Sequence, residues 1–239
     1  MPKKMHELKI KIFSDGAEKA PMLEMAAKPF IKGFTTNPTL MRKAGITDYV
    51  AFAKDILANI KDKPVSFEVF SDEFSEMERQ ARIIASWGPN VYVKIPITNT
   101  KRQSTFDLVK KLAHEGVKIN VTAILTLKQV AHIKEAFPKD ASAIISVFAG
   151  RIADTGHNPF SIMKEAKAIL SSHPKMELLW ASPRQLLDIY YAEEAGSDII
   201  TVTTDILKKL EKIGYDHDEL SLDTVKMFYD DGQKAGYAL

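Results

Sequence analysis

A lysine lies in the middle of a short run that otherwise resembles a buried β-strand. In VYVKIPI (91–97), Lys94 shares one face with Tyr92 and Pro96, while valines and isoleucines occupy the opposite face. Strands buried on both sides are expected to be apolar throughout, so a lysine inside one calls for a functional explanation. Burial disfavours the charged form of a lysine, and the free amine attacks a ketone or aldehyde to form a Schiff base. We therefore predict that Lys94 is a nucleophile in a walled pocket.

Other strand-like runs carry polar residues of the same inward parity. They are Ser66 and Glu68 in VSFEVF (65–70), Asn120 and Thr122 after Lys118 in KINVTAI (118–124), Ser146 between Ile144 and Phe148 in AIISVFA (143–149), and Thr201 and Thr203 in DIITVTT (198–204). The first run ends in Asp15, and the second continues into Thr35 and Asn37. Trp180 is also assigned the inward parity, as part of the wall. Because barrel enzymes build their sites at the C-terminal ends of strands, this distribution predicts an active site.

Two carboxylates and two neutral side chains can supply the rest of the chemistry. Asp15 and Glu68 can divide the proton transfers of a Schiff-base reaction. Asn120 can orient substrate hydroxyl groups, and Thr122 can hold a water. Glu68 is alternatively a structural ion-pair partner of either inward lysine, and Asp15 is alternatively a turn or N-cap residue before the first helix.

Cationic residues follow two of the later strand-like runs. Arg151 comes directly after the sixth run, and Ser182 and Arg184 follow the seventh at the start of the next predicted helix. Two guanidinium groups, a hydroxyl and a helix N-terminus at one rim would bind an anionic group such as a sugar phosphate. The alternatives are a rim salt bridge for each arginine and, for Asn37 with the proline after it, a plain loop-to-helix junction.

The runs that carry these residues recur as a β-then-α unit along the whole chain. Eight β-rich runs lie near 8–15, 33–36, 65–70, 91–97, 118–124, 143–149, 176–182 and 198–204. Segments with helical apolar spacing lie between them, for example 49–60, 105–116, 160–173 and 183–196. Eight such units predict a parallel sheet closed into a (β/α)8 TIM barrel, a fold of the α/β class. The alternative is an open doubly wound sheet, although no Gly-rich phosphate loop follows the first run.

The end of the chain lies beyond the eighth unit. Residues 215–239 predict an amphipathic helical tail that packs across the barrel or onto a neighbouring subunit. No linker or low-complexity tract interrupts the sequence, so residues 1–239 are expected to form a single barrel domain with this extra C-terminal helix.

Composition narrows the possible partners. The 239 residues are 45% hydrophobic and 27% charged, with a net charge of +2, so nucleic acid is not an expected partner. We expect a cytoplasmic protein without a membrane span, because the chain has no cysteine and no apolar run of about 18 residues. The six histidines lack metal-ligand spacing, and no metal is expected.

The motifs resemble those of the transaldolase family, specifically its short-chain branch, which also includes fructose 6-phosphate aldolase-like enzymes. The likeness covers almost the whole chain. Its segments are FSDGA (13–17), GFTTNPTL (33–40), FEV (67–69), VYVKIPIT (91–98), INVTAILT (119–126), SVFAGRI (146–152), ASPR (181–184) and IITVT (199–203). TTNPTL and VKIPIT are the specific motifs among them.

The resemblance implies a role for each matching residue. Lys94 would be the Schiff-base lysine, Asp15 the acid/base at the cleaved bond, and Glu68 with Thr122 the holder of the catalytic water. The substrate-contacting set would be Asn37, Asn120 and Ser146, with Thr35 and Phe148 beside them, and the phosphate site Arg151, Ser182 and Arg184. The ASPR segment is shorter than the family pattern, so Arg184 matches either the phosphate arginine or a helix-opening arginine.

The implied activity is a class I transaldolase that transfers a dihydroxyacetone unit between sugar phosphates and assembles as a homo-oligomer. No cofactor is expected, because the protonated imine is itself the electron sink. Glu68 and Phe148 match transaldolases, whereas the aldolase type carries Gln and Tyr there. The alternatives are an aldolase that releases free dihydroxyacetone, a transaldolase for another anionic sugar, and a non-catalytic sugar-phosphate-binding barrel.

Overall fold

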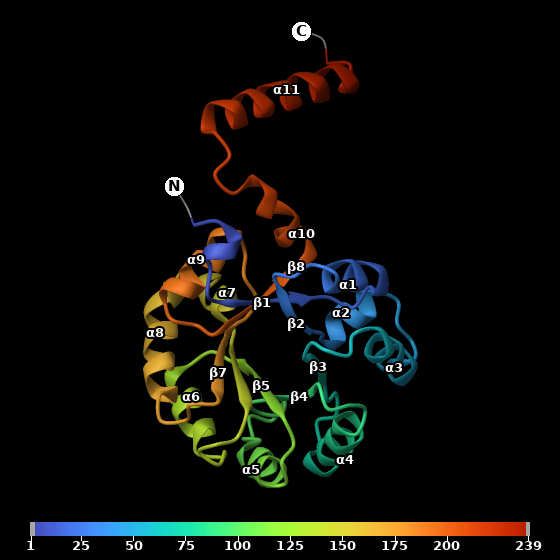
Figure 1. The fold of residues 1–239 in the computed structure, drawn as a ribbon, viewed down its shortest axis with the longest axis vertical. Helices are drawn as coiled ribbons and strands as arrows, with labels where there is room; N and C mark the ends of the chain where they lie inside the picture. The colour runs from blue at the N-terminus through green and yellow to red at the C-terminus, as the bar shows by residue number, and fades with distance from the viewer. Residues whose placement is uncertain (1–2, 238–239) are drawn as a thin grey trace.

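Eight parallel strands close into a barrel in the computed structural model, which describes residues 3–237 (Figure 1). The strands are β1 (Lys11–Asp15), β2 (Ile31–Thr35), β3 (Val65–Glu68), β4 (Val91–Pro96), β5 (Ile119–Ile124), β6 (Ala143–Val147), β7 (Met176–Trp180) and β8 (Ile199–Thr203). They pair in chain order, and β8 pairs with β1 to complete the circle. This confirms the (β/α)8 barrel predicted from the repeating unit.

Helices connect the strands and cover the outside of the barrel (Figure 1). They are α1 (Lys19–Ala26), α2 (Pro38–Lys43), α3 (Tyr49–Asn59), α4 (Phe74–Ala85), α5 (Phe106–His114), α6 (Leu127–Lys134), α7 (Ala149–Ala153), α8 (Pro159–Leu170), α9 (Leu187–Glu194), α10 (Thr204–Leu207) and α11 (His217–Ala235), with short 3-10 turns at Met5–Glu7 and Lys208–Lys212. Side-chain caps begin several of them: Asn37 caps α2, Asp48 caps α3, and Thr126 forms a capping box with Gln129 on α6. Within residues 3–237, no helix has the length and apolar character that a bilayer crossing requires.

The strand register aligns the polar inward residues of neighbouring strands. Glu68 of β3 pairs with Lys94 of β4, and Lys94 pairs with Asn120 of β5. The alternate residues Val93 and Ile95 are fully buried in the layer between barrel and helices. Side chains of paired residues in a parallel sheet share a face, so the predicted inward parity of these three strands is confirmed.

The predicted inward parity of Trp180 is wrong. Trp180 pairs with Val147 and packs with it in the outer apolar layer, whereas its neighbours Leu179 and Ala181 lie inside the barrel. The reason is that β7 is apolar on both faces, as expected for a parallel strand covered by helices, so its composition alone did not indicate which residues point inward.

An apolar plug fills the middle of the barrel. We use this name for Phe13, Ile144, Leu179, Ala181 and Ile199, against which Tyr92 and Phe148 pack. Phe13 requires a glycine opposite it, because a Cβ at Gly33 would lie 2.5 Å from the Phe13 ring. Phe13 and Ile144, with the adjoining Tyr92, line a cavity at the N-terminal ends of the strands, whereas Leu179 and Ala181, with the adjoining Phe148, line a cavity at the C-terminal ends.

The last helix, α11, stands away from the barrel (Figure 1). None of its residues is buried, although it carries Leu220, Leu222, Val225, Met227, Phe228 and Tyr229. Phe228 and Tyr229 are each 66% exposed. Isolated apolar side chains are normal on a surface, but a row of them along one helix is typical of an interaction surface.

Candidate active site

A cavity of about 590 Å³ opens at the C-terminal ends of the strands. It is lined by Asp15, Thr35, Asn37, Glu68, Lys94, Thr122, Ser146, Phe148, Arg151, Ser182 and Arg184, together with Lys43, Ala123, Thr201 and other residues. The structure thus brings eleven of the twelve residues proposed from the sequence to one cavity. The twelfth, Asn120, is fully buried and hydrogen-bonds Ser146 of the wall.

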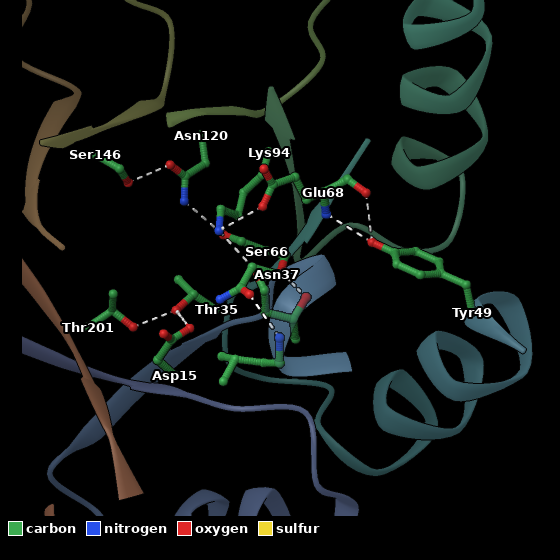
Figure 2. A network of polar contacts seen from close by, with 12 residues as sticks. Asp15, Thr35, Asn37, Tyr49, Ser66, Glu68, Lys94, Asn120, Ser146 and Thr201 are labelled. Carbon is green, nitrogen blue, oxygen red and sulfur yellow. Dashed lines mark hydrogen bonds and ion pairs between the residues drawn. The ribbon is translucent and has the colours of Figure 1, made fainter. Parts of the chain in front are cut away.

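Lys94 is enclosed at the floor of this cavity, with only 6% of its surface exposed. Its Nζ donates to the carbonyl oxygen of Thr36 at 2.8 Å and lies 3.2 Å from Oε2 of Glu68 (Figure 2). The ion pair that was one reading of Glu68 is therefore present. The same contact puts a carboxylate where it can exchange a proton with the lysine nitrogen or with a group bound to it.

Asp15 occupies the end of β1 on the same cavity wall. Its Oδ1 accepts a hydrogen bond from Oγ1 of Thr35 at 2.7 Å, and Thr35 is also hydrogen-bonded to Thr201 (Figure 2). Burial raises the pKa of Asp15, and the nearby Glu68 adds to the rise, while Lys94 and the Thr35 hydrogen bond oppose it. A carboxyl group whose pKa moves toward neutrality is suited to giving and taking a proton.

Glu68 is held through its backbone by a residue that the sequence did not single out. The hydroxyl of Tyr49, at the start of α3, donates to the Glu68 carbonyl oxygen at 2.8 Å and accepts from the Glu68 N–H at 2.9 Å. Burial raises the pKa of Tyr49, so its hydroxyl stays protonated. Sequence spacing gave no signal for this contact, because the two residues are 19 positions apart and lie in different elements.

A second buried network fixes the amide of Asn120. Its Oδ1 accepts from Oγ of Ser146 at 2.6 Å, and its Nδ2 donates to Oγ of Ser66 at 3.2 Å (Figure 2). Ser66 was assigned the inward parity but was not proposed as a site residue. Buried amides need partners on both ends, and these two serines hold Asn120 in one orientation beneath the cavity.

Thr122 lies beside an irregularity in β5. The register with β6 shifts between Val121 and Ile124, and Ala123 has a positive φ of 60°. Such bulges are common next to active sites because they redirect side chains. Within residues 3–237, the buried Oγ1 of Thr122 has no hydrogen-bond partner, although Thr122 lines the cavity. A buried hydroxyl with unused capacity facing a polar cavity suits the binding of a water or a substrate hydroxyl.

At the cationic rim, an alternative reading of Arg184 is confirmed, and the helix after β7 begins later than predicted. Nε of Arg184 lies 3.0 Å from Oδ1 of Asp154, so the rim salt bridge is present. In addition, α9 begins at Leu187 rather than 183, and Oδ2 of Asp188 accepts the N–H groups of Arg184 and Gln185 at 2.6 and 3.3 Å. The Asp188 carboxylate therefore occupies two backbone amides in the loop just before α9, which a bound anion would otherwise be able to use, while no side chain among residues 3–237 caps α9 itself.

The rest of the rim remains open to the cavity. The Arg151 guanidinium lies 5.4 Å from the ring centre of Phe148, within range of a cation–π contact. Lys43, which was not proposed from the sequence, adds a further cation to the lining. Gly150 lies against this wall, because a Cβ there would come within 1.5 Å of the Ser182 carbonyl oxygen. Asn37 has a structural role as well, since its Oδ1 caps α2 by accepting from the Leu40 N–H at 2.9 Å.

A cavity of similar size, about 560 Å³, lies at the other end of the barrel. Its lysines have different surroundings from Lys94. Lys11 pairs with Glu177 at 2.6 Å, and Lys118 donates to the Pro89 carbonyl oxygen at 2.7 Å. Lys118 therefore lies at the opposite end from Glu68, and the reading that pairs these two residues is wrong. In residues 3–237, no group of three or more His, Asp or Glu side chains is placed to hold a metal ion.

Fold and site together define a class: (β/α)8 barrels with a lysine enclosed beside carboxylates at the C-terminal end. The family model described as Transaldolase/Fructose-6-phosphate aldolase matches residues 12–239. The chain belongs to this family, as the resemblance of its motifs implied.

Known proteins agree with this assignment. A probable transaldolase of Dehalococcoides mccartyi is 32% identical over 202 residues, covering 84% of this chain and 90% of that protein. A probable transaldolase 2 of Listeria monocytogenes is 35% identical with 84% and 88% coverage, and a probable transaldolase of Bdellovibrio bacteriovorus is 32% identical with 95% and 99% coverage. A dihydrodipicolinate synthase from Rhodopseudomonas palustris has a TM-score of 0.57 at 13% identity, over 97% of this chain and 82% of that one, and this supports the fold alone. Family and relatives indicate a transaldolase-like enzyme.

Proposed function

We propose that this protein is a class I transaldolase that transfers a dihydroxyacetone unit between sugar phosphates through an imine on Lys94. The observation that carries the proposal is the enclosed Lys94, whose Nζ lies 3.2 Å from Glu68 in the cavity that Asp15 and Thr122 also line. An amine, two carboxylates and a hydroxyl with unused hydrogen-bonding capacity are the groups that Schiff-base chemistry requires.

In the first half-reaction, Glu68 takes a proton from the Lys94 ammonium, and the free amine then adds to the carbonyl carbon of a ketose phosphate. The adduct loses its oxygen as water, with Glu68 supplying the proton, and a protonated imine forms. Asp15 takes the proton of the hydroxyl next to the bond that breaks. The electron pair of that carbon–carbon bond moves into the imine to give an enamine, and the remainder of the sugar leaves as an aldose phosphate.

In the second half-reaction, the enamine attacks the aldehyde carbon of an acceptor aldose phosphate. A new carbon–carbon bond forms, and Asp15 returns its proton to the new hydroxyl. Water held by Thr122 then adds to the imine with Glu68 as base, which releases the product ketose and restores the amine. The imine is the only electron sink that this scheme uses, so it involves no cofactor.

The rest of the cavity accounts for the two ends of the sugar. Asn37, Asn120, Ser146 and Thr35 would contact its hydroxyl groups, directly or through the buried network. Arg151, Ser182 and Arg184 would bind the phosphate, which requires Arg184 to leave Asp154 or to bind both groups. A transaldolase for a different anionic sugar would use the same rim.

Free dihydroxyacetone is the product that separates the two activities of this family. Phe148 and Glu68 favour transfer, because the aldolase type carries Tyr and Gln at the matching positions. A tyrosine hydroxyl would add a proton donor to the wall beside the enamine, and Phe148 adds none. We therefore expect the three-carbon unit to stay on Lys94 until an acceptor arrives.

Borohydride reduction tests this mechanism. With fructose 6-phosphate, intact-mass analysis should find one reduced three-carbon or hexose adduct on Lys94 and none in Lys94→Met. The matched control is Lys118→Met, which removes the inward lysine of the opposite cavity and should keep the adduct. With an aldose phosphate acceptor, a new ketose phosphate should appear, and without one dihydroxyacetone should stay near background.

Three results would contradict the proposal. An adduct that persists in Lys94→Met would place the chemistry elsewhere. Binding of sugar phosphate without any adduct would identify a non-catalytic binding barrel. Steady release of dihydroxyacetone without acceptor would identify the aldolase instead.

The proposal extends to the setting of the enzyme. The exposed apolar row on α11 would pack against a second copy of the chain, giving a homo-oligomer in which residues 1–239 form a single barrel domain and residues 215–239 are its helical tail. An enzyme that interconverts sugar phosphates in this way would belong to the pentose phosphate pathway and would work in the cytoplasm. Its other partners would be its small-molecule substrates.

A further inference from the structure

The backbone of Glu68 needs a hydrogen-bond partner that the barrel does not supply. On one side, β4 continues past this point, and the Val69 N–H donates to the Lys94 carbonyl oxygen at 3.0 Å. On the other side, β2 ends at Thr35, and the last sheet-like contact is the Thr36 N–H to the Ser66 carbonyl oxygen at 3.1 Å. The N–H and carbonyl groups of Glu68 on that side therefore lie beyond the end of the neighbouring strand.

Tyr49 takes the place of the missing strand. Its single hydroxyl oxygen accepts from the Glu68 N–H at 2.9 Å and donates to the Glu68 carbonyl oxygen at 2.8 Å. Unpaired backbone groups are costly when they are partly buried, so this hydroxyl satisfies two groups at once. Figure 2 shows Glu68 between Lys94 on one side and Tyr49 on the other.

Aromatic packing fixes the position of the hydroxyl. The Tyr49 ring lies 5.9 Å from Trp87 and 6.4 Å from Phe67 between ring centres, the latter edge-on. Phe70 covers it from the rim at 5.4 Å. A ring held on three sides has little freedom to move its para substituent, so the hydroxyl is a fixed point to which the Glu68 peptide is attached.

We propose that Tyr49 is a positioning residue for the reaction, which fixes the peptide of Glu68 so that its carboxylate stays beside the Lys94 amine. This inference rests on the proposed function. Glu68 is the last residue of β3, and its side chain is 17% exposed, so the direction of its Cα–Cβ bond depends on how the strand end is held. Catalytic groups must be held closely, because small displacements cost large factors in rate.

Tyr49→Phe isolates the hydroxyl, because it keeps the ring and its packing. We expect turnover with fructose 6-phosphate and an acceptor to fall about tenfold, a fraction of the 10²–10⁴ that proton transfer typically contributes. The KM should stay within about twofold, since Tyr49 does not line the cavity. The rate of the borohydride-reducible adduct should fall by the same factor as turnover. Replacement of Tyr49 by 4-aminophenylalanine, which keeps a group that both donates and accepts, should restore most of the rate.

Tyr190→Phe is the matched control. Tyr190 lies in α9, and its hydroxyl donates to the Lys3 carbonyl oxygen at 2.7 Å. This variant loses a tyrosine-to-backbone hydrogen bond away from the cavity, and its turnover should stay within about twofold of the original. Thermal unfolding of both variants separates lost stability from lost positioning, and the 4-aminophenylalanine protein supplies the comparison should Tyr49→Phe fold poorly.

A double-mutant cycle decides whether Tyr49 acts through Glu68. In a Glu68→Ala background, Tyr49→Phe should cause no further loss in the rate of adduct formation, which mass analysis can follow over hours. The same tenfold loss in both backgrounds, or unchanged turnover in Tyr49→Phe alone, would overturn the inference. Absence of any adduct in the unmodified enzyme would instead overturn the proposed function.

Discussion

Asp15 is held in surroundings that favour its neutral form. Burial raises its pKa above the ordinary value of 3.8, and Lys94 and Thr35 only partly offset the rise. The folded protein therefore binds the proton more tightly than the unfolded chain. By linkage, the free energy of unfolding falls as the pH rises from the ordinary pKa through the raised one, and below both values the penalty is absent. The raised pKa of Asp15 thus lowers the free energy of unfolding at neutral pH, where the carboxyl group is charged in the unfolded chain.

Asp15→Asn should separate chemistry from stability. The amide keeps an oxygen that can accept from Thr35 but carries no charge, so the variant should unfold at a higher free energy than the original at pH 7. That difference should shrink as the pH falls toward 4. Turnover should drop about hundredfold or more, while the reducible adduct on Lys94 still forms. Denaturant unfolding at several pH values and borohydride trapping measure the two effects.

Asp154→Asn is the control for this pH series. Arg184 lowers the pKa of Asp154, so the charged form of this carboxylate is favoured in the folded protein. Loss of the Asp154 charge should therefore reduce the free energy of unfolding slightly or leave it unchanged at neutral pH, whereas Asp15→Asn should increase it. Parallel stability curves for Asp15→Asn and the original protein would contradict the raised pKa.

Single residues were predictable where their type conflicted with their surroundings. Lys94, Glu68 and Asn120 are polar residues at inward positions of apolar strands, and this conflict indicated the site. Tyr49 has no such signal, because an aromatic residue at the start of an amphipathic helix is consistent with ordinary packing. Its role follows only from where β2 ends, which depends on the assembled sheet.

At the scale of elements, α2 shows how one residue can serve both a helix and a cavity. Asn37 caps this helix through its Oδ1 and also lines the cavity. The sequence left two readings of Asn37 open, a loop-to-helix junction and a substrate contact. The observed geometry is compatible with both. A cap uses the side-chain oxygen and leaves the amide nitrogen free to donate to a ligand.

Two substitutions at Asn37 distinguish these roles. Asn37→Ala should lower the free energy of unfolding by about 1 kcal/mol through loss of the cap and should also raise the KM for the sugar phosphate. Asn37→Asp keeps the cap oxygen, so stability should be retained while the KM still rises, because the donor is lost and a negative charge faces an anionic substrate. Unfolding and steady-state kinetics measure the two effects. An unchanged KM in Asn37→Asp would show that Asn37 only caps α2 and does not contact the substrate.

The sequence predicted which helices and strands are present better than it predicted where they begin and which of their faces point into the barrel. The alternation of β-rich runs and helical segments predicted all eight strands, because each run is short, apolar and bounded by helical spacing. The parity of β7 and the start of α9 were missed. Trp180 belongs to a strand without a polar face. The segment before α9 is a loop in which Asp188 accepts the amides of Arg184 and Gln185, a contact that helical spacing does not indicate.

For the whole molecule, α11 is the helix whose apolar side chains lie exposed instead of being buried against another element. Its row of apolar side chains includes Leu222, Val225 and Phe228, spaced three residues apart along one side of the helix, and each is at least 45% exposed. A tail across its own barrel was one reading of the sequence, and the structure places α11 away from the barrel (Figure 1). The other reading, contact with a neighbouring subunit, is the one that the proposed homo-oligomer uses.

Phe228→Asp tests this assembly in the full chain. A charge in the apolar row should shift the protein from oligomer toward monomer, at micromolar concentrations, in sedimentation velocity. Asp230→Lys changes charge on the other side of the same helix and should leave the oligomer intact. The thermal stability of the barrel should change little, because α11 buries none of its residues. A monomeric original protein would contradict the proposed interface.

The apolar plug across the middle of the barrel determines how substrates can arrive. Because Phe13, Leu179 and their neighbours fill the middle of the barrel, the donor and acceptor of the proposed reaction would both enter from the C-terminal ends of the strands. In the proposed mechanism, the first aldose would leave before the second binds, so the enzyme would alternate between a free form and a form that carries the three-carbon unit on Lys94. Double-displacement kinetics of this kind gives parallel lines when the reciprocal of the rate is plotted against the reciprocal of the donor concentration at several acceptor concentrations. An excess of either sugar would inhibit the enzyme by binding to the form that reacts with the other sugar.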